Sequence, residues 1–170
     1  MLQIKQKILR NQADKLIRKQ KNRKVAVKKI QKVAVLNNPG SKLSFDNLKY
    51  VQKTLGLSSN QFDIITFKDK RDNYNELRGL VISKDIFSAF GKIKSPEVIT
   101  FLNKEYDLLL DFTTMSNVYE RYLSLSIHAN CRVGYYNEEE LYDVMLMVAP
   151  GNIKAYIDEA KRYLKIIGLL

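Results

Sequence analysis

The sequence predicts a three-layer α/β domain built on a mostly parallel sheet of about five strands, with a basic helix added at the N-terminus. Short apolar runs alternate with segments of helical periodicity along the chain, and this alternation requires helical crossovers between parallel strands. The runs are almost wholly apolar, as expected of strands that are buried on both faces. The chain has 170 residues, of which 45% are hydrophobic, and this is enough for one domain with a proper core.

Residues 1–29 are predicted to form a basic helix or arm, and residues 30–170 a single α/β domain. We expect the helix to run from Met1 to about Lys24, because its apolar residues fall on one narrow helical stripe. That stripe consists of Leu2, Leu9, Ala13 and Leu16.

The domain that follows repeats the order strand, turn, helix. Its expected strands are Lys32–Leu36, Phe62–Phe67, Tyr106–Asp111, Cys131–Tyr135 and Val144–Val148, with a short edge strand at Leu80–Ile82. A loop is expected at Asp69–Asn75. A helix is expected at Ser44–Leu55, with Gly56 at its end, and a second begins at Pro96 after the cap Ser95. A third follows Asp111, and a fourth is expected at Ile153–Ile167. Thr113, Thr114, Ser116 and Asn117 are the candidate caps of the third of these helices.

The charge of the chain is concentrated at its N-terminal end. The net charge is +11, and residues 1–32 contain 12 lysines and arginines against one acid, Asp14, whereas the remainder has 17 of each sign. The arm is therefore either a solvated amphipathic helix packed on the domain or a surface for RNA or a ribonucleoprotein. A membrane-surface helix ranks third, because the segment has no Trp or Phe to anchor it. The predicted nucleic-acid-binding residues are Lys19, Lys21, Arg23, Lys24, Lys28 and Lys29.

Composition argues against several other classes of protein. The single cysteine, Cys131, excludes internal disulfides and cysteine-built metal sites, and we expect neither metal nor cofactor. The single histidine, His128, is expected to cap or pack at a helix C-terminus, and no nucleophile motif accompanies it. There is no secretory signal and no run of about 20 apolar residues, so a cytoplasmic protein is expected.

The alternative function is a small-ligand site where the strands end. The strand–helix–strand unit from Glu105 to Tyr135 places a helix N-terminus at the carboxyl edge of the sheet, where doubly wound folds hold ligands. The first loop contains one glycine, Gly40, and so matches neither the dinucleotide fingerprint nor a P-loop. The polar residues expected to converge there are Asn37, Asn38, Ser41, Thr113, Thr114 and Asn117.

Two carboxylates of the central strand are also candidates for this edge. Asp107 and Asp111 lie four residues apart and share a face, as an acid/base or metal pair would. The preferred interpretation is that Asp111 anchors the following turn by accepting backbone N–H bonds. We therefore name no catalytic residue, and the protein is expected to be a binding module rather than an enzyme.

Two motifs in the later half resemble a known family. The run Asp107–Phe112 and the triplet Arg132-Val133-Gly134 resemble the N-terminal Rossmann-like domain of bacterial heptosyltransferase-type glycosyltransferases. The whole chain is also similar to a family of short bacterial proteins of unknown function with a basic N-terminal helix. The resemblance implies a Rossmann-like core and, as the alternative function, a degenerate glycosyltransferase-like or nucleotide-binding domain. It carries over no catalytic residue, because the glycine-rich loop and the domain that would bind a nucleotide sugar have no counterpart in this sequence.

Overall fold

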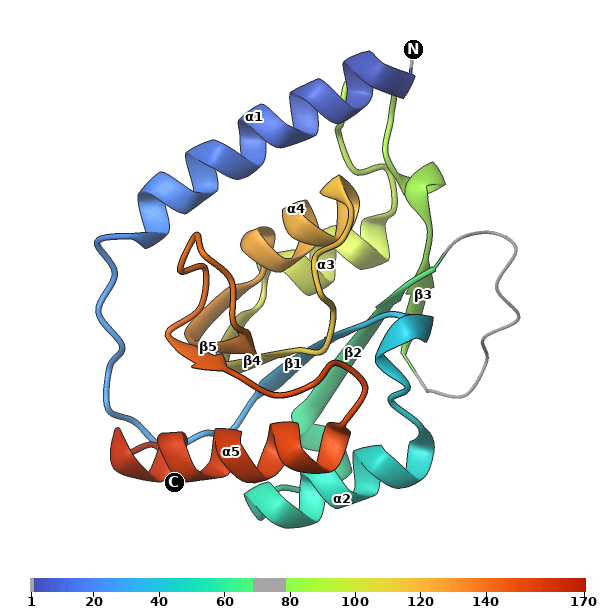
Figure 1. Cartoon of the computed structure of the whole chain (residues 1–170). Coiled ribbons are helices and arrows are strands. Elements are labelled where there is room, and N and C mark those ends of the chain that lie inside the picture. Colours follow the sequence, from blue (N-terminus) through green and yellow to red (C-terminus); the bar gives the residue numbers. More distant parts are fainter. Residues whose placement is uncertain (1, 69–78) are drawn as a thin grey trace.

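The computed structural model describes residues 2–68 and 79–170, so the loop expected at Asp69–Asn75 lies outside the described residues. Its centre is an all-parallel sheet of six strands in the order β3-β2-β1-β4-β5-β6 (Figure 1). The strands are β1 Val33–Asn37, β2 Phe62–Phe67, β3 Leu80–Ile82, β4 Glu105–Asp111, β5 His128–Tyr135 and β6 Val144–Leu146. The predicted α/β class, the parallel sheet and the short edge strand are confirmed.

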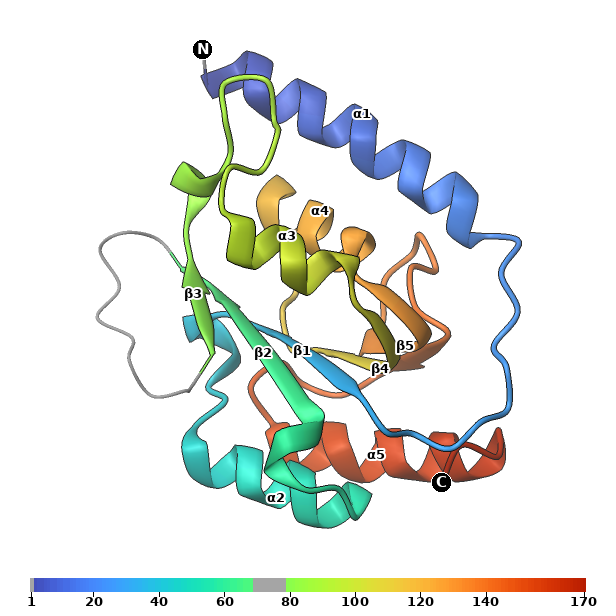
Figure 2. The same cartoon turned by 180° about the vertical axis from the view of Figure 1, so that it is seen from behind.

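Helices cover both faces of the sheet. They are α1 Leu2–Gln20, α2 Phe45–Leu55, α3 Pro96–Asn103, α4 Val118–Ser126 and α5 Ile153–Ile166. The helices α2 and α5 pack on one face, whereas α3 and α4 pack on the other (Figure 2). Each face buries its own hydrophobic cluster, and this explains why the strands read as continuous apolar runs rather than alternating ones.

The strand order creates one point where the direction of winding reverses. Strand β1 lies between β2 and β4, and Leu36 near its end is opposite Asp111 at the end of β4. Because the connections after β1 and β4 leave the sheet in opposite directions, a crevice opens beyond the carboxyl ends of these two strands.

Most helix boundaries follow from capping residues that the sequence displays. Ser44 and Ser95 accept hydrogen bonds from the first turns of α2 and α3, and Gly56 ends α2 in the left-handed conformation. Among the four candidate caps of α4, the structure selects Asn117, whose Oδ1 accepts from the N–H groups of residues 119 and 120. Thr113 is occupied earlier, because it closes the turn after β4.

The prediction that the first helix continues to Lys24 is wrong. Helix α1 ends at Gln20, since the chain beyond it is drawn into an extended path along the domain by side-chain contacts with β5. Gln20 itself donates from Nε2 to the carbonyl oxygen of Leu125 at 2.9 Å. These are tertiary contacts, which helical periodicity cannot reveal.

Helix α1 packs as an additional layer over α4 (Figure 1). Leu9 and Ala13 are fully buried there. Ala13 belongs to a cluster with Leu141 and Tyr142, which lie in the connection between β5 and β6. This connection, residues 136–143, has no helix, although a parallel crossover usually supplies one. Helix α1 therefore covers apolar surface that a crossover helix would otherwise cover.

Candidate functional site

The segment of residues 21–32, which we call the arm from here on, links the end of α1 to the start of β1 (Figure 1). It is hydrogen-bonded to residues near the amino ends of β4 and β5. Of the six predicted nucleic-acid-binding residues, Lys19 lies in the last turn of α1 and the other five lie in the arm. Lys19, Lys21, Lys24, Lys28 and Lys29 are exposed, whereas Arg23 is half-buried. The predicted nucleic-acid-binding residues therefore differ in exposure, and Arg23 is the one that is partly covered.

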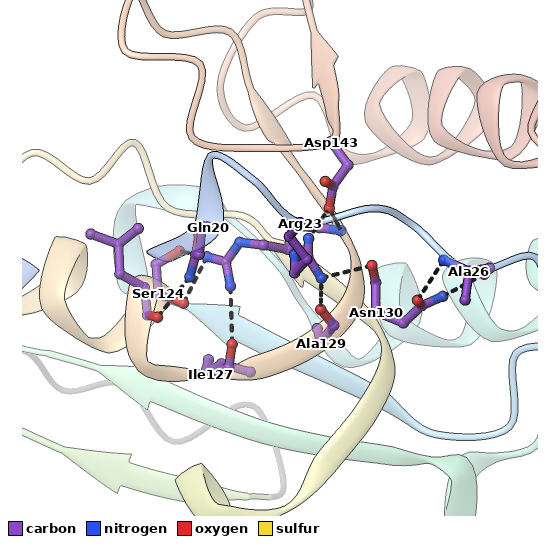
Figure 3. Close-up of polar contacts among 10 residues, drawn as sticks. Gln20, Arg23, Ala26, Ser124, Ile127, Ala129, Asn130 and Asp143 are labelled. Atoms are coloured by element: carbon purple, nitrogen blue, oxygen red, sulfur yellow. Dashed lines mark hydrogen bonds and ion pairs between the residues drawn. The ribbon is translucent and has the colours of Figure 1, made fainter. Parts of the chain in front are cut away.

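Arg23 anchors the arm to β5. Its guanidinium forms an ion pair with Asp143 and donates to the carbonyl oxygens of Ala129 and Asn130, the latter at 2.7 Å (Figure 3). The amide side chain of Asn130 exchanges two hydrogen bonds with the backbone of Ala26, at 2.9 and 2.8 Å. The charge of Arg23 is therefore paired within the molecule, and a polyanion would have to compete with Asp143 for the guanidinium.

Lys28 makes the second attachment. Its Nζ lies 2.7 Å from Oδ1 of Asp107, while Oδ2 of the same carboxylate accepts from the backbone N–H groups of Gln31 and Lys32 at 2.8 and 2.9 Å. Burial alone would raise the pKa of Asp107, but the hydrogen bonds from Lys28, Gln31 and Lys32 outweigh it and lower the pKa below its usual value. Asp107 thus orients the entry of the chain into β1.

The other cations of this region face outward. Lys19, Lys21, Lys24 and Lys29 form no ion pair within residues 2–68 and 79–170. The same holds for a row of exposed cations on α1, which consists of Lys7, Arg10, Lys15 and Arg18. We call these eight residues the basic face. Because it extends along α1, it is longer than the block that the sequence singled out.

A cavity of about 400 Å³ lies between the arm and the amino ends of β4 and β5. Among its lining residues the only carboxylate is Glu105, whereas the arm side supplies the side chains of Lys19, Arg23, Lys24 and Lys28. Of these four cations, Arg23 and Lys28 are paired with Asp143 and Asp107, so Lys19 and Lys24 are the ones that favour an anionic group in this concave surface.

The sequence around Arg132 indicates no structural or functional role for it. Arg132 is singled out only as part of the motif that resembles the glycosyltransferase family. It is buried, and its guanidinium donates to the carbonyl oxygens of Ser124 and Ile127 at 2.7 and 3.0 Å, at the C-terminal end of α4. The expected cap at this position, His128, is exposed at the start of β5, so that expectation was wrong. The signal in the sequence for this role was an arginine in a strand that directly follows a helix, because a cation there can bind the last carbonyl groups of the helix.

The six residues predicted to line the crevice do not all meet. Asn38 and Asn117 line one cavity of about 450 Å³ at the junction of β1 and β4, which we call the crevice. Thr113 and Thr114 line a separate cavity of about 380 Å³, together with residues that follow β5 and β6. The crossover after β4 separates the two, so the sequence predicted the correct edge of the sheet but not the grouping.

Asn37 and Ser41 are buried and hold the loop after β1. The side chain of Asn37 is hydrogen-bonded to the hydroxyl of Ser41, which also lies 2.9 Å from the carbonyl oxygen of Asn38. The neighbouring N–H of Ser41 is bonded to Oδ1 of Asn38 at 2.9 Å. These residues shape the wall of the crevice, and neither is among its lining residues.

The carboxylates of β4 do not form a pair. Asp107 is at the amino end of the strand beside Lys28, and Asp111 is at the carboxyl end, about 13 Å away at a rise of roughly 3.3 Å per residue. Asp111 accepts from the N–H and hydroxyl of Thr113 at 2.9 and 2.7 Å and from the hydroxyl of Tyr142 at 2.7 Å. Its predicted role as the anchor of the turn is confirmed, and burial raises its pKa.

Glu120 is a crevice residue that the sequence did not indicate. Glu120 lies in the first turn of α4, its side chain accepts from Nδ2 of Asn38 at 2.8 Å, and it is only 3% exposed. Burial raises the pKa of Glu120, and the nearby charge of Asp111 acts in the same direction. Within the described residues, no group of three or more His, Cys, Asp and Glu side chains is arranged to hold a metal ion.

Comparison with known proteins adds the family. A family model described as "Family of unknown function (DUF6913)" matches residues 5–167. The match includes most of α1 and the whole sheet. No curated protein and no solved structure matched the chain. None of the described helices carries an apolar stretch long enough to cross a membrane.

Proposed function

The chain belongs to a family of unknown function (DUF6913), and on that premise we propose that it is a non-enzymatic binding module whose basic face docks on RNA, either free or within a ribonucleoprotein. The observation that carries the proposal is that the N-terminal cations fall into two groups, one that is ion-paired and one that is exposed without such pairs. Arg23 and Lys28 form ion pairs that fasten the arm, while the cations of the basic face are exposed and lack such pairs within the described residues.

A fastened arm favours association with a polyanion. Its backbone is already ordered by contacts to Asp107, Asn130 and Asp143, so less conformational entropy is lost when RNA binds than for a free tail. The cavity beneath the arm offers one phosphate group a concave contact with Lys19 and Lys24, which form no ion pair among the described residues. Residues 1–32 contain no aromatic side chain to stack on bases, so we expect little preference for sequence.

The test is a salt titration of RNA binding measured by fluorescence anisotropy. The triple variant Lys21→Gln, Lys24→Gln, Lys29→Gln should lose affinity about tenfold or more at low salt, and its log–log salt slope should fall by about 2, at roughly 0.7 per phosphate contact. All three side chains are exposed, so the melting temperature should stay close to that of the parent.

The matched control removes three exposed lysines from α2 and the loop before it, on the face of the sheet opposite α1, through Lys42→Gln, Lys49→Gln and Lys53→Gln. It changes the net charge equally and should retain the parent's salt slope. Equal losses in both variants would reduce the effect to net charge alone. Absence of salt-sensitive binding by the parent would refute RNA docking.

A second candidate is a small-ligand site in the crevice. It is favoured by a cavity of about 450 Å³ at the point where the winding of the sheet reverses, the usual ligand position in open α/β sheets. The nucleotide-binding and degenerate glycosyltransferase-like alternatives would both place their ligand here. This function concerns a different edge of the sheet from the arm, and each can be tested without the other.

A further inference from the structure

The crevice contains a buried polar group that bonds to none of the described residues. Tyr119 lines the crevice and is only 5% exposed, yet its hydroxyl has no hydrogen-bond partner among the described residues. Its ring stacks on Phe67, with centroids 5.8 Å apart and planes inclined by 16°. A buried hydroxyl without a partner is costly, so its retention beside a cavity points to a partner that arrives with a ligand.

The charged groups of the crevice are unevenly distributed. Lys68 and Lys84 line it from the segments that follow β2 and β3, and α4 directs its N-terminus toward it through Asn117 and Tyr119. The opposing carboxyl is Glu120, which is buried and held by Asn38. Two ammonium groups and the positive end of the α4 dipole together suit a phosphate, although the N–H groups of residues 119 and 120 are already bonded to Asn117. The buried carboxyl is an acceptor for a hydroxyl.

Helix α1 closes one side of this space. Gln6 lines the crevice, and the neighbouring Lys5 donates from Nζ to the carbonyl oxygens of Lys84 and Phe87 at 2.8 and 2.9 Å. The crevice is therefore bounded by groups from five segments of the chain. Its volume lies within the range of about 300–1,000 Å³ that is typical of small-molecule sites.

We propose that the crevice binds a phosphate monoester of a hydroxyl-bearing small molecule, either a sugar phosphate or a mononucleotide. The phosphate lies against Lys84, Lys68 and the N-terminus of α4, and ligand hydroxyl groups hydrogen-bond to Glu120 and to the hydroxyl of Tyr119. The inference rests on the second candidate function above and is independent of RNA docking.

The test uses four probes with the full chain in isothermal titration calorimetry: ribose 5-phosphate, adenosine 5′-monophosphate, adenosine and inorganic phosphate. Ribose 5-phosphate or the mononucleotide should bind with a Kd of about 1 mM or tighter, and adenosine and inorganic phosphate should each bind at least about tenfold more weakly. Tighter binding of the mononucleotide identifies a nucleotide site, whereas equal binding of the two esters identifies a sugar phosphate site. Both results support the proposal.

Three single variants locate the binding. Lys84→Gln should weaken binding of the phosphate esters about tenfold, because it removes a charge-assisted contact. Tyr119→Phe should weaken binding several-fold without lowering the melting temperature, since the hydroxyl bonds to none of the described residues in the free protein. Lys53→Gln, on the exposed side of α2, is the control and should bind as the parent does.

The possible failures are distinct. If neither ester binds at about 10 mM, or if Lys84→Gln and Tyr119→Phe bind as the parent does, the proposal is wrong. A fragment mixture screened by ligand-observed NMR then decides the broader question. An unphosphorylated fragment that Tyr119→Phe weakens would overturn the phosphate ester but retain a small-ligand crevice, whereas no binder at all would remove both.

Discussion

At the scale of single residues, two buried polar side chains connect β5 and the segment after it to α4 and β4. Arg132 binds the C-terminal carbonyl groups of α4, and Tyr142 reaches from the connection after β5 to the buried carboxylate of Asp111. The ring of Tyr142 lies directly over Gly134 in β5, where a Cβ atom would overlap it. Glycine is thus required there for close approach and not for backbone conformation.

Gly134→Ala should destabilise the protein by about 1–3 kcal/mol, the usual cost of overpacking a core. The added methyl group must displace Tyr142, which also loses its bond to Asp111. Urea unfolding monitored by circular dichroism measures the change. Gly40→Ala is the control, because a Cβ at that position meets only Asn38 Oδ1 at an ordinary 3.4 Å. Equal unfolding midpoints for both variants and the parent would contradict the close approach.

At the scale of elements, the arm behaves as a structural segment although it contains neither helix nor strand. Asp107, Asn130 and Asp143 each bind it, through main-chain groups or through Arg23 and Lys28. The same stretch therefore attaches the outer helix to the sheet and presents cations to the solvent.

The attachment at Asp107 should depend on pH. Because its pKa in the folded protein lies below the ordinary value of 3.8, the carboxylate stabilises the fold above that pH, and the contribution disappears as pH falls through the lowered pKa. Asp107→Asn should therefore lower the melting temperature at neutral pH, and the difference from the parent should shrink in acid below pH 3.8.

Differential scanning fluorimetry from neutral to acidic pH provides the measurement. Asp14→Asn removes an exposed carboxylate of α1 that forms no ion pair within the described residues, and it should leave the melting temperature at neutral pH close to the parent's. A difference between Asp107→Asn and the parent that grows toward acid pH would have the wrong sign for this mechanism.

At the scale of the whole molecule, α1 and the remainder of the chain share their hydrophobic cores. Leu9 joins the cluster beneath α3 and α4, and Ala13 joins the cluster that covers the connection between β5 and β6. The basic face therefore lies on a helix whose other side is part of the core. RNA docking and folding would then use opposite sides of one element.

Leu9→Ala should cost about 2–5 kcal/mol of unfolding free energy, as expected for a fully buried leucine. Ile4→Ala, in the same helix but 62% exposed, should change stability by less than about 0.5 kcal/mol. Urea titrations of both variants measure the two values. If Leu9→Ala were as stable as Ile4→Ala, the helix would be a separate appendage, as the boundary between residues 29 and 30 implies.

The sequence by itself determined the features that depend on neighbouring residues. Apolar runs located the six strands, Ser44, Ser95 and Gly56 marked helix ends, and the composition of residues 1–32 located the excess charge. Asp111 could be assigned to the turn because its partner, Thr113, is two residues away. Short-range preferences of this kind are encoded within a few positions of each residue.

Only the tertiary structure decided which of these residues meet. Arg23 is separated from Asp143 by 120 positions, so nothing local distinguishes it from the unpaired lysines around it. The six polar residues at the carboxyl edge divided between two cavities and a buried loop, because the order of the strands and the path of each crossover set their neighbours. Glu120 and Tyr119 entered the crevice for the same reason. Pairing between distant segments is fixed by packing of the whole core, and a pattern read along the chain carries no record of it.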